Sequence, residues 1–91
     1  MFKEIKIIYK KLGRNKVHGY AYKDGTIEID SRLKGKKHLE ILLHEIFHVF
    51  NYRESEEKIV LKSVTLTKIL WEQGYRRIDN TNEIPLQDGS E

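Results

Sequence analysis

The stretch that decides the fold is LEILLHEIFHVF, residues 39–50. Its apolar residues point in nearly every direction around a helix, which predicts a helix over residues 37–51 that is buried on most sides. Five polar residues form a stripe along this otherwise apolar helix: Glu40, His44, Glu45, His48 and Asn51. A polar stripe on a buried helix needs partners, and a metal ion with its water would provide them.

Three members of the stripe follow the pattern H-E-x-x-H. His44 and His48 are four residues apart, so their imidazoles project from successive turns of one helical face and can bind the same zinc ion. Glu45 is offset by about 100° around the helix. It is therefore expected to act as a general base on a water molecule that the zinc activates, rather than to bind the ion. The pattern predicts a zinc metallopeptidase with Glu45 as its catalytic residue.

The third zinc ligand is expected to be a carboxylate. Hydrolytic zinc sites usually have three protein ligands, and this chain has no cysteine. Glu56 is favoured because it begins a second helix, on the side predicted to face the first, although it could instead complement the positive N-terminus of that helix. Glu57 and Glu54 stay open as alternatives. Glu54 stands where the longer pattern H-E-x-x-H-x-x-G-x-x-H has its third histidine, but Asn51 replaces the glycine.

Three strands are predicted before the central helix. Residues 2–9, FKEIKIIY, form a short run rich in isoleucine that is typical of a strand. Residues 17–29 predict a hairpin around Asp24-Gly25, a pair suited to a tight turn. Thr26 to Asp30 is the segment expected to offer a sheet edge to an extended substrate.

A second helix is predicted over residues 56–73, with Ser55 as its N-cap and Gly74 at its end. Its inward face is expected to carry the apolar residues Ile59, Val60, Val64, Leu70 and Trp71, with the small Ser63 and Thr67 between them. We therefore expect an α+β fold with a three-stranded antiparallel sheet followed by two helices (β-β-β-α-α). The predicted domain covers residues 1–77, and residues 78–91 form a polar C-terminal tail.

Other polar residues have less specific roles. Candidates for stabilising an oxyanion during peptide hydrolysis are His18, Tyr20, Tyr22, Tyr52 and Arg76. His38 falls on a different helical face from His44 and is expected at the surface.

Composition narrows the class of protein. A chain of 91 residues allows one small domain. The N-terminus lacks the pattern of a signal peptide, and no run approaches the about 18 apolar residues of a membrane span, so a cytoplasmic protein is expected. Residues 1–38 carry 11 lysines and arginines against 4 acidic residues, whereas residues 39–91 carry 6 against 10. Because the lysines lack accompanying aromatic residues along the chain, they indicate solvated faces rather than a nucleic-acid interface.

A resemblance to a known family supports the zinc prediction. The segments GYAYKDGTIEIDSRLKGKKHLEILLHEIFH and SEEKIVLKSVTLTKILWEQGYR resemble the small H-E-x-x-H metallopeptidase-like proteins of phages and prophages, distant relatives of the SprT-like and ImmA/IrrE-type zincins. The resemblance covers about residues 18–77. It implies a minimal zincin fold, His44 and His48 as zinc ligands, Glu45 as catalytic base and Glu56 as third ligand. Ser31 stands where the family would have proline, which affects only the entry to the helix.

The sequence therefore predicts a zinc-dependent metallopeptidase that acts on a peptide or protein substrate. The alternative is a non-catalytic zinc-containing binding module that contacts nucleic acid or a host protein through its basic N-terminal half. No membrane partner is expected, and the oligomeric state does not follow from the sequence.

Overall fold

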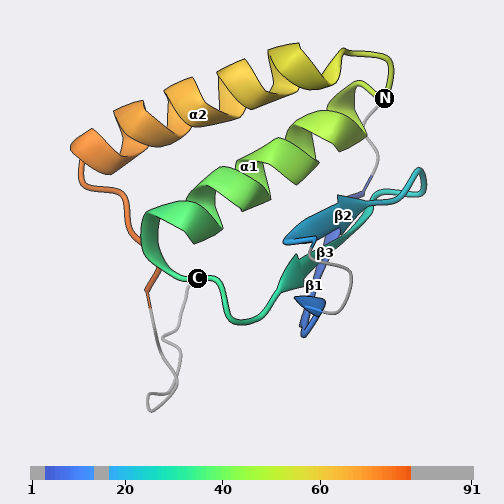
Figure 1. The fold of residues 1–91 in the computed structure, drawn as a ribbon, viewed down its shortest axis with the longest axis horizontal. Helices are drawn as coiled ribbons and strands as arrows, with labels where there is room; N and C mark the ends of the chain where they lie inside the picture. The colour runs from blue at the N-terminus through green and yellow to red at the C-terminus, as the bar shows by residue number, and fades with distance from the viewer. Residues whose placement is uncertain (1–3, 14–16, 79–91) are drawn as a thin grey trace.

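A helix, α1, lies between a second helix, α2, and a three-stranded sheet (Figure 1). The computed structural model of this chain describes residues 4–13 and 17–78. The elements are, in chain order, β1 (Lys6–Lys10), β2 (Gly19–Ala21), β3 (Thr26–Asp30), α1 (Gly35–Phe50) and α2 (Glu56–Glu72). The molecule is thus a small α+β protein with the predicted element order.

The sheet is mixed, so the prediction of an all-antiparallel sheet was wrong. Its strand order is β1-β3-β2, with β1 parallel and β2 antiparallel to the central β3. The hairpin of β2 and β3 forms as predicted around Gly25, whose φ is 98°. β3 takes the centre because its two isoleucines, Ile27 and Ile29, are fully buried there. β2 has three residues and includes a glycine, which suits a short edge strand.

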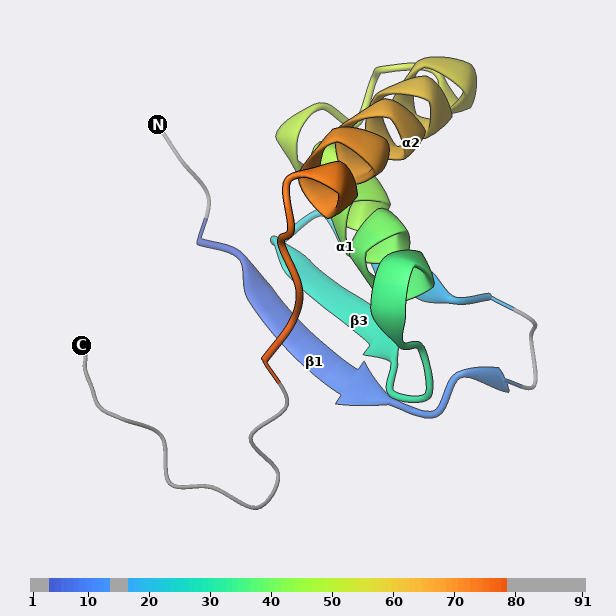
Figure 2. The same ribbon diagram turned by 90° about the vertical axis from the view of Figure 1, so that its left-hand side faces the viewer.

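The core lies between the sheet and α1. Ile27 and Ile29 of β3 pack with Val49 of α1, and partly buried apolar residues surround them: Ile5, Ala21, Leu33, Ile41, Leu42 and Ile46. α1 contacts β2 and β3 but covers β1 little, so all five residues of β1 are exposed. The helix-facing side of β1 is therefore left for the chain that follows α2 to approach (Figure 2).

The two helices are joined by a short, ordered connection. The side chain of Asn51 at the end of α1 accepts a hydrogen bond from the Arg53 backbone, and its carbonyl accepts one from Glu54 N–H. Ser55 Oγ accepts a hydrogen bond from Lys58 N–H at 3.2 Å, which confirms the predicted N-cap of α2. Gly74, with φ of 94°, follows the helix as predicted.

α2 contacts α1 through a narrower face than predicted. Ile59, Ser63 and Thr67 are its fully buried residues, whereas Val60 and Val64 are 42% and 45% exposed. The prediction was wrong for these two valines because the small side chains, rather than the valines, form the centre of the contact. Small residues at a helix contact allow the two backbones to approach closely.

Two of the predictions concern the chain as a whole. Neither helix in the described part of the chain has the length and apolar character needed to cross a membrane. The predicted C-terminal tail lies outside the described residues except for Ile78.

Thr67 provides a test of the helix contact. Its Oγ1 is the buried side-chain polar atom that has no hydrogen-bond partner among the described residues. Valine has nearly the same shape without the hydroxyl, so Thr67→Val should raise the free energy of unfolding by about 1 kcal/mol, measured by urea denaturation. The matched control is Thr65→Val on the exposed side of α2, which should change stability by less than about 0.5 kcal/mol. A loss of stability in Thr67→Val would contradict the buried contact described here.

The hydrogen-bonded carboxylate of Asp30 should make the stability of the fold depend on pH. Hydrogen bonds from the side chain and backbone of Arg32 hold the pKa of the Asp30 carboxyl below its usual value. Because the unfolded pKa is about 3.9, the carboxylate stabilises the fold above that pH, and this contribution is lost as the pH falls towards the folded pKa. Thermal melts should therefore show that Asp30→Asn is less stable at neutral pH and loses less stability on acidification than the wild type. Parallel pH profiles for the two proteins would contradict this.

Candidate metal centre

Three side chains converge at the end of the helix pair where α1 leads into α2. His44 and His48 lie on successive turns of α1, and Glu56 is the first residue of α2. The two Nε2 atoms are 3.2 Å apart. Glu56 Oε2 lies 3.0 Å from His44 Nε2, and Glu56 Oε1 lies 3.0 Å from His48 Nε2. The structure thus brings together the two predicted histidines and the favoured third residue.

The geometry of this cluster fits a zinc ion. Ligand atoms bound tetrahedrally at about 2.0–2.1 Å from zinc lie roughly 3.3 Å from one another. The two Nε2 atoms, 3.2 Å apart, have that spacing, and each lies 3.0 Å from a different oxygen of Glu56. Two imidazoles and one carboxylate are also a ligand set that hydrolytic zinc sites use. The side chains of His44 and His48 are 16% and 24% exposed, whereas that of Glu56 is 63% exposed. The cluster therefore opens to solvent on the side of Glu56, which leaves room for a water molecule or a substrate.

The two alternatives for the third ligand lie outside the cluster. Glu57 is not among the described residues that converge with the histidines. Glu54 instead forms an ion pair with Lys62, whose Nζ lies 2.8 Å from both carboxylate oxygens. This pair ties the connection between the helices to the second turn of α2. It therefore helps to fix the start of α2, where Glu56 lies.

Glu45 lies beside the two histidines, on the side of α1 that faces β2: the charges of His48 and Glu56 both act on its carboxyl group, and its side chain packs on the sheet. Glu45 is 8% exposed. A Cβ atom added to Gly19 of β2 would lie 3.1 Å from Glu45 Cγ and 3.0 Å from Ile41 Cγ2. The backbone of β2 therefore packs directly on Glu45, and a larger residue at position 19 would displace it.

Burial shifts the pKa values of Glu45 and His44 on α1. It raises the pKa of Glu45 to about 6, an effect that nearby His48 opposes and Glu56 reinforces. Burial likewise lowers the pKa of His44, although the Glu56 carboxylate opposes the shift. A lowered pKa favours the neutral imidazole, which is the form that binds a metal ion.

The candidate oxyanion stabilisers are scattered. The Tyr22 hydroxyl donates to Glu28 on the open face of the sheet, and Tyr20 packs edge-on against Tyr22. Arg76 stacks on Trp71 at the far end of the helix pair. His18 precedes β2, where its carbonyl accepts a hydrogen bond from Asp30 N–H. Tyr52 lies in the connection between His48 and Glu56, and so is the candidate nearest to the ligands along the chain.

His38 was predicted at the surface, and this was wrong. It is 5% exposed, because its ring stacks on Tyr9 of β1 and its Nε2 lies 3.0 Å from the Tyr9 hydroxyl. Burial, with a contribution from the charge of Arg77, lowers the pKa of His38. His38 does face away from His44, as predicted. It is nevertheless buried, because Tyr9 of β1 and Arg77, which follows α2, lie close to it.

The predicted substrate edge was also wrong. β3 is paired on both sides, with β1 and β2, so Thr26 to Asp30 offers no free edge. β2 is an edge strand instead, and Gly19 places it beside Glu45. The hairpin alone could not reveal this, because either of its strands can become the central one.

No protein-family model, curated protein or solved structure matches this chain. The site is therefore assigned from its own geometry. Two contacts that support the site could not be predicted from the sequence: the packing of Gly19 against Glu45 and the Glu54–Lys62 ion pair. Both depend on which elements become neighbours in the fold.

Glu56 and Glu57 form a matched pair for testing the ligand set. Glu56→Gln removes the carboxylate that faces both histidines, so zinc affinity should fall by about 100-fold or more, measured by competition with a chromophoric chelator. Glu57→Gln makes the same change one residue later and should leave the affinity nearly unchanged. A larger loss in Glu57→Gln than in Glu56→Gln would show that the wrong carboxylate has been assigned.

Proposed function

We propose that this protein is a zinc-dependent metallopeptidase with a minimal zincin-like domain. The observation that carries the proposal is the convergence of His44, His48 and Glu56 within ligand distance of one another, with Glu45 one residue from the first histidine. The H-E-x-x-H pattern supplies the two histidines and the base in the arrangement that metallopeptidases use.

Each side chain then has a distinct task. His44, His48 and Glu56 would hold a zinc ion, which would supply Lewis-acid activation of water and of the substrate carbonyl. Glu45 accepts a proton from the attacking water and returns it to the leaving amine nitrogen as the peptide C–N bond breaks. Its position against β2 limits its motion and keeps the carboxyl group partly shielded from bulk water. The proton acceptor is therefore held in place before a substrate arrives.

The free edge of β2 supports a peptide as substrate. An extended peptide can add to an exposed sheet edge through backbone hydrogen bonds. β2 is such an edge, and its first residue, Gly19, lies against Glu45. A peptide bound there would have its backbone beside the proposed base. Such binding would recognise the extended backbone of a substrate peptide rather than its side chains.

The second candidate, a non-catalytic zinc module, uses the same three ligands. The difference between the two functions lies in Glu45, which a purely structural zinc site does not need. Its burial beside the metal cluster favours the enzyme.

Glu45→Gln tests the proposal directly. The amide cannot accept the proton, so turnover should fall by about 10²–10⁴-fold while zinc affinity is retained. Activity can be followed by mass spectrometry of a digested peptide library, with zinc content measured on the same samples. Glu40→Gln is the control, since it changes a carboxylate of the same stripe one turn before His44 and should retain activity. Undiminished cleavage by Glu45→Gln would exclude the mechanism.

A further inference from the structure

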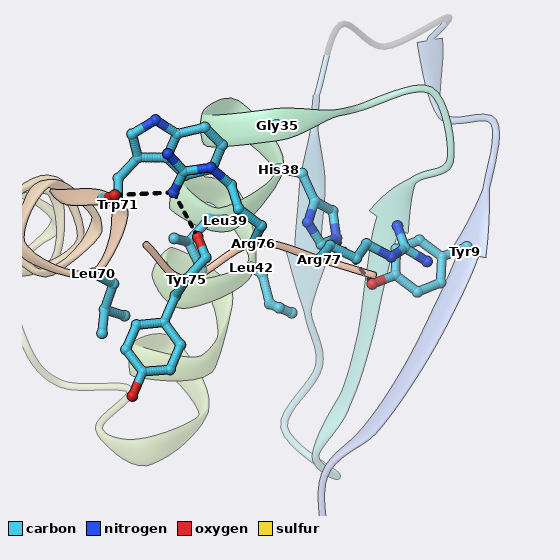
Figure 3. Close-up of a pocket in the computed structure, with 10 residues that line it drawn as sticks. All are labelled: Tyr9, Gly35, His38, Leu39, Leu42, Leu70, Trp71, Tyr75, Arg76 and Arg77. Atoms are coloured by element: carbon cyan, nitrogen blue, oxygen red, sulfur yellow. Dashed lines mark hydrogen bonds between the residues drawn. The ribbon is translucent and has the colours of Figure 1, made fainter. Parts of the chain in front are cut away.

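A cavity of about 370 Å³ lies between the start of α1 and the end of α2, and Figure 3 shows the residues that line it. Its floor is apolar, formed by Leu39 and Leu42 of α1 with Leu70 of α2. The remaining lining residues are Tyr9, Gly35, His38, Trp71, Tyr75, Arg76 and Arg77. The metal ligands come from the opposite ends of the same helices, so the two sites share no residue.

Two guanidinium groups that line this cavity each lie over an aromatic ring. The Arg76 guanidinium lies 3.5 Å from the centre of the Trp71 ring, and that of Arg77 lies 4.6 Å from the centre of the Tyr9 ring. Arg76 is held there by hydrogen bonds that it donates to the carbonyls of Trp71 and Tyr75. The cavity wall therefore presents flat, cationic stacking surfaces on two sides.

The rim of the cavity is basic. Among the described residues that line it, none is acidic. Gly35 is flanked by three exposed lysines: Lys34, Lys36 and Lys37. The first turn of α1 contains no acidic residue, and its N-cap makes no side-chain hydrogen bond. With Arg76 and Arg77, the lysines bring five cationic side chains to this end of the molecule, where the carboxylate of Glu72, paired with Lys68, also lies near Lys36.

We propose that this cavity and its rim bind single-stranded nucleic acid. One base would enter the apolar cavity and stack on the guanidinium planes of Arg76 and Arg77, which lie over Trp71 and Tyr9. Lys36, Lys37 and the edges of the same guanidinium groups would contact the adjoining phosphates. No aromatic residue is adjacent to these lysines in the sequence. In the fold, however, Tyr9, Trp71 and Tyr75 line the cavity beside them. Stacking surfaces beside a cationic groove are the combination that binds single strands without reading their sequence.

The same features disfavour two other occupants. A duplex keeps its bases stacked on one another, so it could use the lysines but not the cavity. An acidic peptide could likewise pair with the cations, but its carboxylates gain nothing from the flat aromatic walls. A single-stranded nucleotide uses both the charge and the rings.

The test uses Trp71, the only tryptophan of the chain, as its probe. A short oligothymidylate titrated into the full-length protein should change the intrinsic fluorescence, since a base that enters the cavity would stack on the Arg76 guanidinium that lies over the indole. Binding should weaken as salt rises, because phosphate contacts release counterions. Zinc chelation should leave both effects unchanged, since the metal cluster is remote.

Two double variants test the surface. Arg76→Gln/Arg77→Gln should weaken binding by about tenfold and reduce the salt slope by roughly 1.4, because each single-strand phosphate contact contributes about 0.7. Lys36→Gln/Lys37→Gln changes only exposed residues at the rim and should reduce the slope similarly. Arg53→Gln/Lys58→Gln is the matched control, which removes the same charge at the metal-centre end and should retain both affinity and slope.

Three results would overturn the proposal. The first is no fluorescence change with oligothymidylate at low salt. The second is an equal loss of affinity in the control variant, which would show attraction by net charge alone. The third is that duplex DNA or poly-glutamate gives the same fluorescence change with equal affinity, which would assign the surface to a different class of partner.

Discussion

The convergence of His44, His48 and Glu56 depends on how closely α2 lies against α1. The contact is made by Ile59, Ser63 and Thr67, and two of these side chains are small. Larger residues there would hold the helices farther apart and lengthen the 3.0 Å separations between Glu56 and the two histidines. The Glu54–Lys62 ion pair also helps to position Glu56, because it ties the connection between the two helices to α2. The ligand set is therefore a property of helix packing as much as of the H-E-x-x-H pattern.

The offset of Glu45 from the histidines assigns the two flanks of α1 to different tasks. His44 and His48 face α2, which supplies the proposed third ligand, Glu56, whereas Glu45 packs through its Cγ on Gly19 of β2. A helix exposed on either flank could not provide both environments. The placement of α1 between sheet and helix (Figure 1) thus gives the proposed ligands and the proposed base different neighbours on one helix. Gly19 is part of this arrangement, because only a residue without a side chain lets β2 approach so closely.

Local signals predicted most of the elements but not how they pack. The pattern of α1, the Ser55 cap and the Asp24-Gly25 turn each depend on neighbouring residues, and the structure confirms all three. The parallel pairing of β1 with β3 could not be predicted, because the connection between β1 and β2 is long enough for either arrangement. The predictions for His38, which is buried, and for Val60, which is exposed, failed for the same reason. Both depend on which surfaces meet after the elements have formed.

The N-terminus of α1 carries positive charges that are unfavourable for the helix itself. The positive end of a helix dipole favours acidic residues, yet α1 begins among Lys34, Lys36 and Lys37 with no acid in its first turn. Each lysine so placed costs about 0.3–1 kcal/mol when exposed, and less as salt screens it. The Ser55-capped α2, by contrast, begins with Glu56 and Glu57, as helix stability favours. An anion bound at the rim of the cavity would offset the repulsion at the start of α1, so the charge pattern that is unfavourable for the free helix becomes favourable in a complex with phosphate groups.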